Sequence, residues 1–171
     1  ALGDTHSTMS LGGSGRVWFS GSPETTDFHD RAQGGGEVDS GNALVVTVRK
    51  QDFAAEVEVI KEPVGVWSFD ALSWEVADAG DVERIVDELA AYPDKDRTVI
   101  KYAITGTLGL AAMARLETEL AELEPVFAAL YPRQRLMQLH LDPSVEELEN
   151  LPLTGYALSL IHISEPTRRT P

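Results

Sequence analysis

Residues 98–104 have the sequence TVIKYAI, in which β-branched and aromatic side chains predominate. Such side chains fit the pleated surface of a sheet, so the sequence predicts a strand here. Because the run is largely apolar, we expect this strand at the centre of a sheet. The segment that follows, Thr105-Gly106-Thr107, predicts the turn by which the chain leaves the strand.

Two helices are predicted, one before this strand and one after it. In residues 82–89 apolar side chains recur at spacings of three and four, which is the period of a helix with one buried face. Residues 108–124 have a second stripe of this kind, and Pro125 lacks the amide that the helix would need to continue. With strands predicted at residues 66–76 and 136–141, the order strand, helix, strand, helix, strand indicates an α+β layer.

The N-terminal half is predicted to consist of strands and loops. Residues 43–49 are largely apolar and residues 56–61 alternate valine with glutamate, as in a hairpin with one covered face and one wet face. Residues 16–20 predict another short strand. Residues 27–42, which include three consecutive glycines, show no period and are interpreted as a loop. Pro63-Val64-Gly65 interrupts these patterns, and we place a boundary between two units there.

The composition limits the class of protein. The 171 residues are 43% hydrophobic and 25% charged and include no cysteine, which predicts a soluble globular chain without disulfides or cysteine-based metal sites. No apolar run approaches membrane-spanning length and no signal segment opens the chain, so we expect a cytoplasmic protein with no membrane partner. The net charge is −14, and residues 133–135 provide only two arginines. Composition therefore gives no independent support for nucleic-acid binding.

Two potential metal ligands, Asp4 and His6, follow Gly3 near the start of the chain. Side chains at i and i+2 of an extended segment point the same way, so this pair can face one site. A carboxylate oxygen and an imidazole nitrogen are ligands that Mn, Fe or Zn accept. Taken alone, such a pair is more often an ordinary part of a loop than a metal site.

The sequence that follows strengthens the metal interpretation. Residues 3–7, GDTHS, precede a predicted hairpin and then residues 18–24, WFSGSPE. In this order they resemble the end of the catalytic domain of SbcD-like proteins, which are calcineurin-like metallophosphoesterases and nuclease subunits of a DNA double-strand-break repair complex. The resemblance extends over residues 1–157. It implies that residues 1–62 are the C-terminal part of a metallophosphoesterase β-sandwich and that residues 63–157 are a small α+β capping domain.

The resemblance also implies a site with two divalent metal ions, Mn²⁺ first and Mg, Fe or Zn as alternatives. His6 matches the second histidine of the family's Gly-His-x-His element, whereas Asp4 stands where the family has a histidine. Asp4 is therefore either a substituted ligand or a carboxylate that orients a ligating imidazole. Ser20, Gly21 and Ser22 lie near the metals in the family and would bind the substrate phosphate. The alternative for these three residues is a structural turn.

The implied function is phosphodiester hydrolysis in DNA repair, with paired metals that activate water for in-line attack. The implied partners are DNA and an SbcC-like ATPase subunit, and the intact protein could form a homodimer. The family's other ligands would lie upstream, so we expect this chain to be an inactive fragment. Two alternatives stay open: a metallophosphoesterase acting on other phosphoesters, and a non-catalytic binding module. Residues 158–171 resemble the translation of a sequencing-library adaptor and are left out of the fold prediction as a non-native tail.

Overall fold

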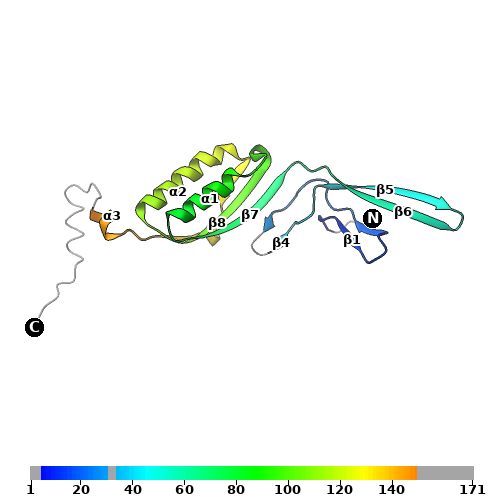
Figure 1. Ribbon diagram of the computed structural model, residues 1–171, viewed down its shortest axis with the longest axis horizontal. Helices are drawn as coiled ribbons and strands as arrows, with labels where there is room; N and C mark the ends of the chain where they lie inside the picture. Colours follow the sequence, from blue (N-terminus) through cyan, green and yellow to red (C-terminus); the bar gives the residue numbers. More distant parts are fainter. Residues whose placement is uncertain (1–4, 31–33, 150–171) are drawn as a thin grey trace, which may run out of the picture.

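The computed structural model describes residues 5–30 and 34–149 of the chain (Figure 1). It is a mixed α/β protein whose main sheet is mostly parallel, which is compatible with the predicted α+β class. Figure 1 shows two helices lying against the sheet toward one end of an elongated molecule and a long two-stranded hairpin at the other. None of the helices in the two described ranges has the length and apolar character that crossing a bilayer requires.

The main sheet has the strand order β10-β8-β7-β3-β4, with β9 also paired to β8. The strand predicted at residues 98–104 is confirmed as β8 (Thr98–Leu108), which pairs in parallel with β7 (Ser68–Val76). Along its other edge β8 pairs in parallel with β9 (Ala129–Pro132) and then with β10 (Gln138–Leu141). The sequence did not predict β9, because a four-residue strand is too short to show a clear period.

The connections from β7 to β8 and from β8 to β9 each contain a predicted helix, and both helices lie on the same side of the sheet (Figure 1). The first, α1 (Ala79–Ala90), begins after Asp78, whose carboxylate accepts hydrogen bonds from the Gly80 and Asp81 amides at 2.8 and 3.1 Å. This cap satisfies amides that have no partner inside the helix. The second, α2 (Leu110–Leu123), ends before Pro125, as predicted. The remaining short helical elements in this part of the chain are η1 (Lys95–Arg97), η2 (Glu124–Val126), η3 (Gln134–Leu136) and α3 (Val145–Glu149).

The hydrophobic core lies between these two helices and the sheet. Its largest fully buried side chains come from β7, β8, α1 and α2: Val76, Val82, Ile85, Leu89, Ile100, Ile104, Leu108 and Leu116. Full burial of one such side chain contributes about 1.5–3 kcal/mol relative to leaving it in water. The apolar stabilisation of the described residues is therefore concentrated in this half of the molecule.

The turn predicted at residues 105–107 is wrong, because β8 continues through it to Leu108. Gly106 has φ +117°, which only glycine adopts readily, and a Cβ atom there would collide with the Val76 carbonyl oxygen. The glycine therefore allows two neighbouring strands to approach closely instead of ending one of them. This continuation supplies the edge on which β10 pairs.

Before β7 the described residues form two antiparallel hairpins that lie outside the main sheet. The smaller one joins β1 (Met9–Leu11) to β2 (Val17–Phe19). The larger one joins β5 (Asn42–Gln51) to β6 (Ala54–Pro63), so the strands predicted at residues 43–49 and 56–61 are confirmed and are longer than predicted.

The interpretation of residues 27–42 as a loop is wrong in part, because two short strands lie within this segment. Strand β3 (His29–Asp30) pairs in parallel with β7, and β4 (Gly35–Gly36) pairs antiparallel with β3. Strands of two residues have no alternation that a sequence can display, and their pairing depends on partners far along the chain. The main sheet therefore includes strands from both sides of Pro63-Val64-Gly65.

Candidate functional site

His6 lies where three separate segments of the N-terminal half are joined through their backbones. The Thr8 amide donates to the Asp39 carbonyl at 2.7 Å, and the Ser22 amide donates to the His6 carbonyl at 2.8 Å. The Gly41 amide in turn donates to the Ser22 carbonyl at 2.9 Å. These bonds hold the backbone at His6 in place without a hydrophobic core around it.

One nitrogen of the His6 ring is engaged by two other side chains. Its Nδ1 lies 2.7 Å from the Thr26 hydroxyl and 3.3 Å from Glu37 Oε2. The Thr26 hydroxyl also donates to Glu37 Oε2 at 2.8 Å, so the three side chains form a closed triangle. The His6 side chain is 64% exposed, whereas the Glu37 side chain is only 3% exposed. The imidazole is therefore exposed at the surface, whereas the carboxylate that contacts it is buried.

The Glu37 carboxylate stays charged in this buried position because protein donors surround it. Burial raises the pKa of Glu37, but hydrogen bonds from the Ser40 and Thr26 side chains, the Thr26 amide and His6 outweigh burial and lower this pKa below its usual value. The Thr26 amide donates to Glu37 Oε1 at 3.2 Å, so both carboxylate oxygens have partners. Glu37 is therefore an acceptor of fixed position.

A surface cavity of about 380 Å³ lies beside His6 and is lined by Thr5, His6, Asp27, Gly36 and Glu37. Its two carboxylates differ in availability. Glu37 is committed to the donors described above, whereas Asp27 is exposed and accepts a hydrogen bond from the Phe28 amide at 2.7 Å. The cavity is large enough for several water molecules, or for one small anion together with a bound metal ion.

The Ser20-Gly21-Ser22 segment, predicted as substrate-binding, lies directly against the His6 backbone. Gly21 has φ +72°, and a Cβ atom there would lie 2.7 Å from the Thr8 amide nitrogen and 2.8 Å from the His6 carbonyl oxygen. Glycine is therefore required for this close approach. The structure brings the segment and His6 together, but the Ser22 amide is already bonded to His6.

Asp4, the other predicted metal ligand, lies outside the described residues. Within residues 5–30 and 34–149, no group of three or more histidine and carboxylate side chains is arranged to hold a metal ion. A complete metal site in a protein usually needs about four ligands. His6 fits the role of one ligand, since its second ring nitrogen has no hydrogen-bond partner among the described residues. The other ligands would have to come from elsewhere.

Charged side chains near β3 have different surroundings from those of His6. Asp30, close to His29 in the sequence, forms an ion pair with Arg133 at 3.5 Å. Lys101 of β8 lies 3.9 Å from the centre of the Phe28 ring, which is a cation–π contact between the segment before β3 and the C-terminal half. These contacts connect β3 and the residue before it to the C-terminal half. Neither contact brings together three side chains of the described residues that could bind a metal ion.

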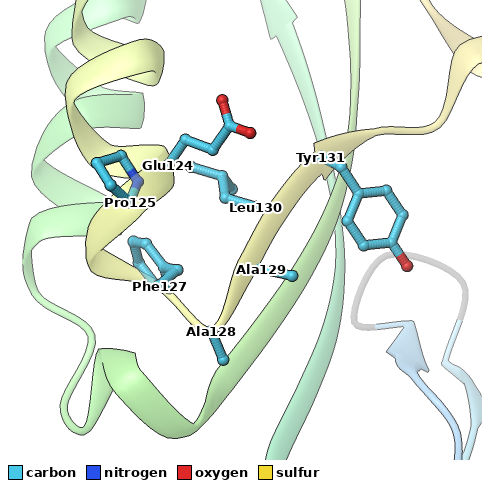
Figure 2. Close-up of a pocket in the computed structure, with 7 residues that line it drawn as sticks. All are labelled: Glu124, Pro125, Phe127, Ala128, Ala129, Leu130 and Tyr131. Carbon is cyan, nitrogen blue, oxygen red and sulfur yellow. The ribbon is translucent and has the colours of Figure 1, made fainter.

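A larger cavity of about 640 Å³ lies in the C-terminal half at η2 and β9 (Figure 2). Its residues are Glu124, Pro125, Phe127, Ala128, Ala129, Leu130 and Tyr131. Figure 2 shows the Tyr131 ring pointing away from the Glu124 carboxylate, so the two polar groups do not converge. Without converging polar groups this cavity is a weaker candidate for chemistry than the one beside His6.

Sequence reasoning missed the two side chains that hold His6. Thr26 and Glu37 lie 20 and 31 residues after it, in a segment without any period. A threonine and a glutamate at these positions carry no local signal of their contact. Comparison of the chain with protein-family models, with curated proteins and with solved structures finds no match.

Proposed function

We propose that this chain is part of a metal-dependent phosphodiesterase of the SbcD-like kind, which hydrolyses DNA together with an SbcC-like ATPase. The observation that carries the proposal is the His6 imidazole, held through Nδ1 by Thr26 and Glu37 beside a cavity, with no partner for its other nitrogen among residues 5–30 and 34–149. Histidine ligands in metal sites are typically oriented in this way by a carboxylate.

The proposal assigns residues 1–62 to the end of the metallophosphoesterase sandwich, residues 63–157 to the capping domain and residues 158–171 to a non-native tail. The mixed α/β architecture is compatible with the α+β class of this proposal, although β3 and β4 from residues 1–62 pair into the same main sheet as β7 and β8. The β5–β6 hairpin also favours it, because its exposed valines would suit the edge of a larger sheet structure.

In the proposed site, His6 is a metal ligand and Asp4 is a ligand or an orienting carboxylate. The Ser20-Gly21-Ser22 turn would lie against the substrate phosphate, since its backbone touches that of His6. Bound divalent ions, Mn²⁺ first and Mg, Fe or Zn as alternatives, would supply an activated water and charge stabilisation for phosphoester hydrolysis. The remaining ligands would come from an upstream part of the protein.

The acidic composition favours no particular substrate. At a net charge of −14 the chain would repel a polyanion at long range, so local positive charge from bound ions would have to attract the phosphate. A metallophosphoesterase acting on small phosphoesters satisfies the same observations at His6. A substrate comparison separates these two possibilities.

The test compares the protein encoded by the complete natural gene with its His6→Ala variant in the presence of Mn²⁺. Several kcal/mol of charge stabilisation depend on the ions, so loss of a ligand should reduce DNA cleavage by about 100-fold or more. His140→Ala, which changes an exposed histidine on β10, is the matched control and should keep full activity.

Three other outcomes would change the conclusion. Cleavage of bis(p-nitrophenyl) phosphate without DNA cleavage would identify a phosphoesterase of small substrates. Capture of the ATPase by a protein that hydrolyses neither compound would favour a binding module. Undiminished Mn²⁺-dependent cleavage by the His6→Ala variant would overturn the metal assignment.

A further inference from the structure

We infer that Thr26 and Glu37 are positioning residues that keep the neutral His6 imidazole protonated on Nδ1, so that Nε2 is the atom offered to a metal. The link to a metal rests on the proposed function. The protonation pattern itself rests only on the hydrogen bonds of the described residues.

The assignment follows from counting protons in the triangle of side chains. The Thr26 hydroxyl has one proton, and it donates this proton to Glu37 Oε2 at 2.8 Å. An ionised carboxylate can only accept a hydrogen bond, so Glu37 cannot be the donor to Thr26. In its 2.7 Å contact with His6 Nδ1, the Thr26 oxygen must therefore be the acceptor. Nδ1 consequently carries a proton.

The second contact of Nδ1 leads to the same assignment independently. Glu37 Oε2 lies 3.3 Å from Nδ1 and has no proton to give. A bare Nδ1 would direct its lone pair at two oxygens that are both rich in electrons. A protonated Nδ1 has an acceptor in either direction, which makes this tautomer the one that the surroundings stabilise.

Glu37 is suited to this role because it cannot easily move. Its side chain is 3% exposed, and the Thr26 amide holds Oε1 at 3.2 Å. The preceding Gly36 has φ +84°, and a Cβ atom on it would collide with the Phe28 carbonyl oxygen, so the backbone lies tightly against the segment leading into β3. The position of the carboxylate is therefore fixed both by the backbone to which it is attached and by its hydrogen-bond donors.

The rest of the ring is left open by this arrangement. With Nδ1 turned toward Thr26 and Glu37, the 64% exposed imidazole has Nε2 without a partner among the described residues. In a neutral ring protonated on Nδ1, Nε2 has the free lone pair that a metal ligand needs. The two positioning residues thus determine which nitrogen binds.

The tautomer can be measured directly on the isotope-labelled 171-residue chain. Long-range proton–nitrogen correlation spectra distinguish the two ring nitrogens at a pH where the spectrum shows the neutral ring, and His6→Gln assigns the signals. We expect the proton on Nδ1 in the wild type. An Nε2-protonated wild-type ring would overturn the inference.

Two variants test whether Thr26 and Glu37 cause this preference. Thr26→Val removes the 2.7 Å contact at an exposed position, and Glu37→Gln places an amide that can donate to the Thr26 oxygen. Glu37→Gln should raise the population protonated on Nε2, and Thr26→Val should raise it to a smaller extent because the Glu37 contact at 3.3 Å remains. Thr25→Val, which changes a neighbour of Thr26 outside the hydrogen bonds to the ring found among the described residues, should leave the tautomer unchanged. An unchanged tautomer in a folded Thr26→Val protein and in Glu37→Gln would exclude the positioning role.

Addition of Mn²⁺ separates this inference from the proposed function. We expect paramagnetic broadening of resonances from residues 5–7 and about 10–100-fold weaker binding in Glu37→Gln, with Thr25→Val as control. In the protein encoded by the complete natural gene, which would supply the remaining ligands, a wild-type ring protonated on Nδ1 that Mn²⁺ does not broaden would overturn the metal function and leave the positioning role standing. Equal Mn²⁺ affinity of Glu37→Gln and the wild type would show that the orientation does not serve a metal.

Discussion

The two halves of the molecule are held together by different forces. In the C-terminal half, the buried side chains come from residues 70–130 and are apolar except for Asp70 and Thr98. Among the described residues before β7, the buried side chains other than alanine or glycine are Thr8, Glu37 and Asn42, all of them polar. One half depends on hydrophobic burial and the other on hydrogen bonds.

The difference explains why the candidate site lies in the half without a core. A hydrogen bond fixes direction as well as distance, whereas apolar packing is not directional. Asn42 Nδ2, for example, donates to the Asp39 side chain at 3.1 Å and to the Ser40 carbonyl at 3.1 Å. No buried side-chain polar atom in the described ranges lacks a partner. Such a network holds individual groups in place but contributes little net stability per bond.

The β5–β6 hairpin is the clearest example of apolar surface without burial. Val46 and Val48 are 53% and 60% exposed, and their cross-strand partners are Val59 and Val57. These four side chains point to the same face of the hairpin. In the C-terminal half, valines and isoleucines at comparable strand positions are fully buried by α1 and α2.

The largest expected effect is on the free energy of unfolding, and it should distinguish the two halves when one apolar side chain is truncated in each. Ile104→Ala, in the centre of β8, should reduce the free energy of unfolding by about 2–5 kcal/mol, because it leaves a cavity in a closed core. Val46→Ala should change it by about 0.5 kcal/mol or less, since much of that side chain is already in water. Urea denaturation monitored by circular dichroism measures both. A comparable loss in Val46→Ala would mean that the hairpin face is covered in solution.

An intermediate effect is expected at Gly21, which joins the candidate site to its neighbours. Gly21→Ala adds a Cβ atom 2.7 Å from the Thr8 nitrogen at φ +72°, so it should cost about 1–3 kcal/mol and disturb the backbone at His6. Gly13→Ala is the matched control, because a Cβ atom there meets nothing within 4 Å. Amide spectra should shift at residues 5–8 in the first variant and leave Trp74 unchanged in both. If Gly13→Ala proved equally disruptive, the close approach at Gly21 would not be the cause.

The smallest expected effect concerns Glu24, which connects the halves. Its carboxylate accepts hydrogen bonds from the Val66 and Trp67 amides at 3.1 Å and from the Thr25 amide at 3.0 Å. Burial raises the pKa of Glu24, but these three backbone donors outweigh it and lower the pKa below the usual 4.5.

The sign of the pH dependence follows from this lowered pKa. Glu24 stabilises the junction above pH 4.5, and the contribution is lost as the pH falls through the lower pKa of the folded state. Protection of the Val66 and Trp67 amides against hydrogen exchange, relative to the intrinsic rate at the same pH, should therefore fall as the pH drops below 4.5, while protection in α1 should not. Glu24→Gln should remove the acid dependence. Acid-sensitive exchange that persists in Glu24→Gln would point to another carboxylate.

Much of the C-terminal half could be predicted because its signals are local. The three-and-four spacing of Val82, Ile85 and Leu89 indicates a helix with one apolar face, and the structure buries all three. The turn at Gly106 was the error there. A glycine that ends a strand and a glycine that lets a neighbouring strand approach look the same in the local sequence. Only the position of the Val76 backbone distinguishes these two cases at Gly106.

The candidate site could be predicted only in part. The pair Asp4 and His6 drew attention by its spacing, and the Ser20-Gly21-Ser22 turn does lie against His6. Thr26 and Glu37 gave no signal, because contacts over 20 and 31 residues depend on the path of the chain rather than on a repeat.

The sequence by itself determined the alternation of strands and helices from β7 to α2, since side-chain periods of two and about 3.6 are properties of neighbouring residues. Only the tertiary structure decided that β3 joins β7 in parallel and that a buried glutamate supports His6. The physical reason is that hydrogen bonds between distant segments become favourable only after the chain has brought them together and removed water from around them.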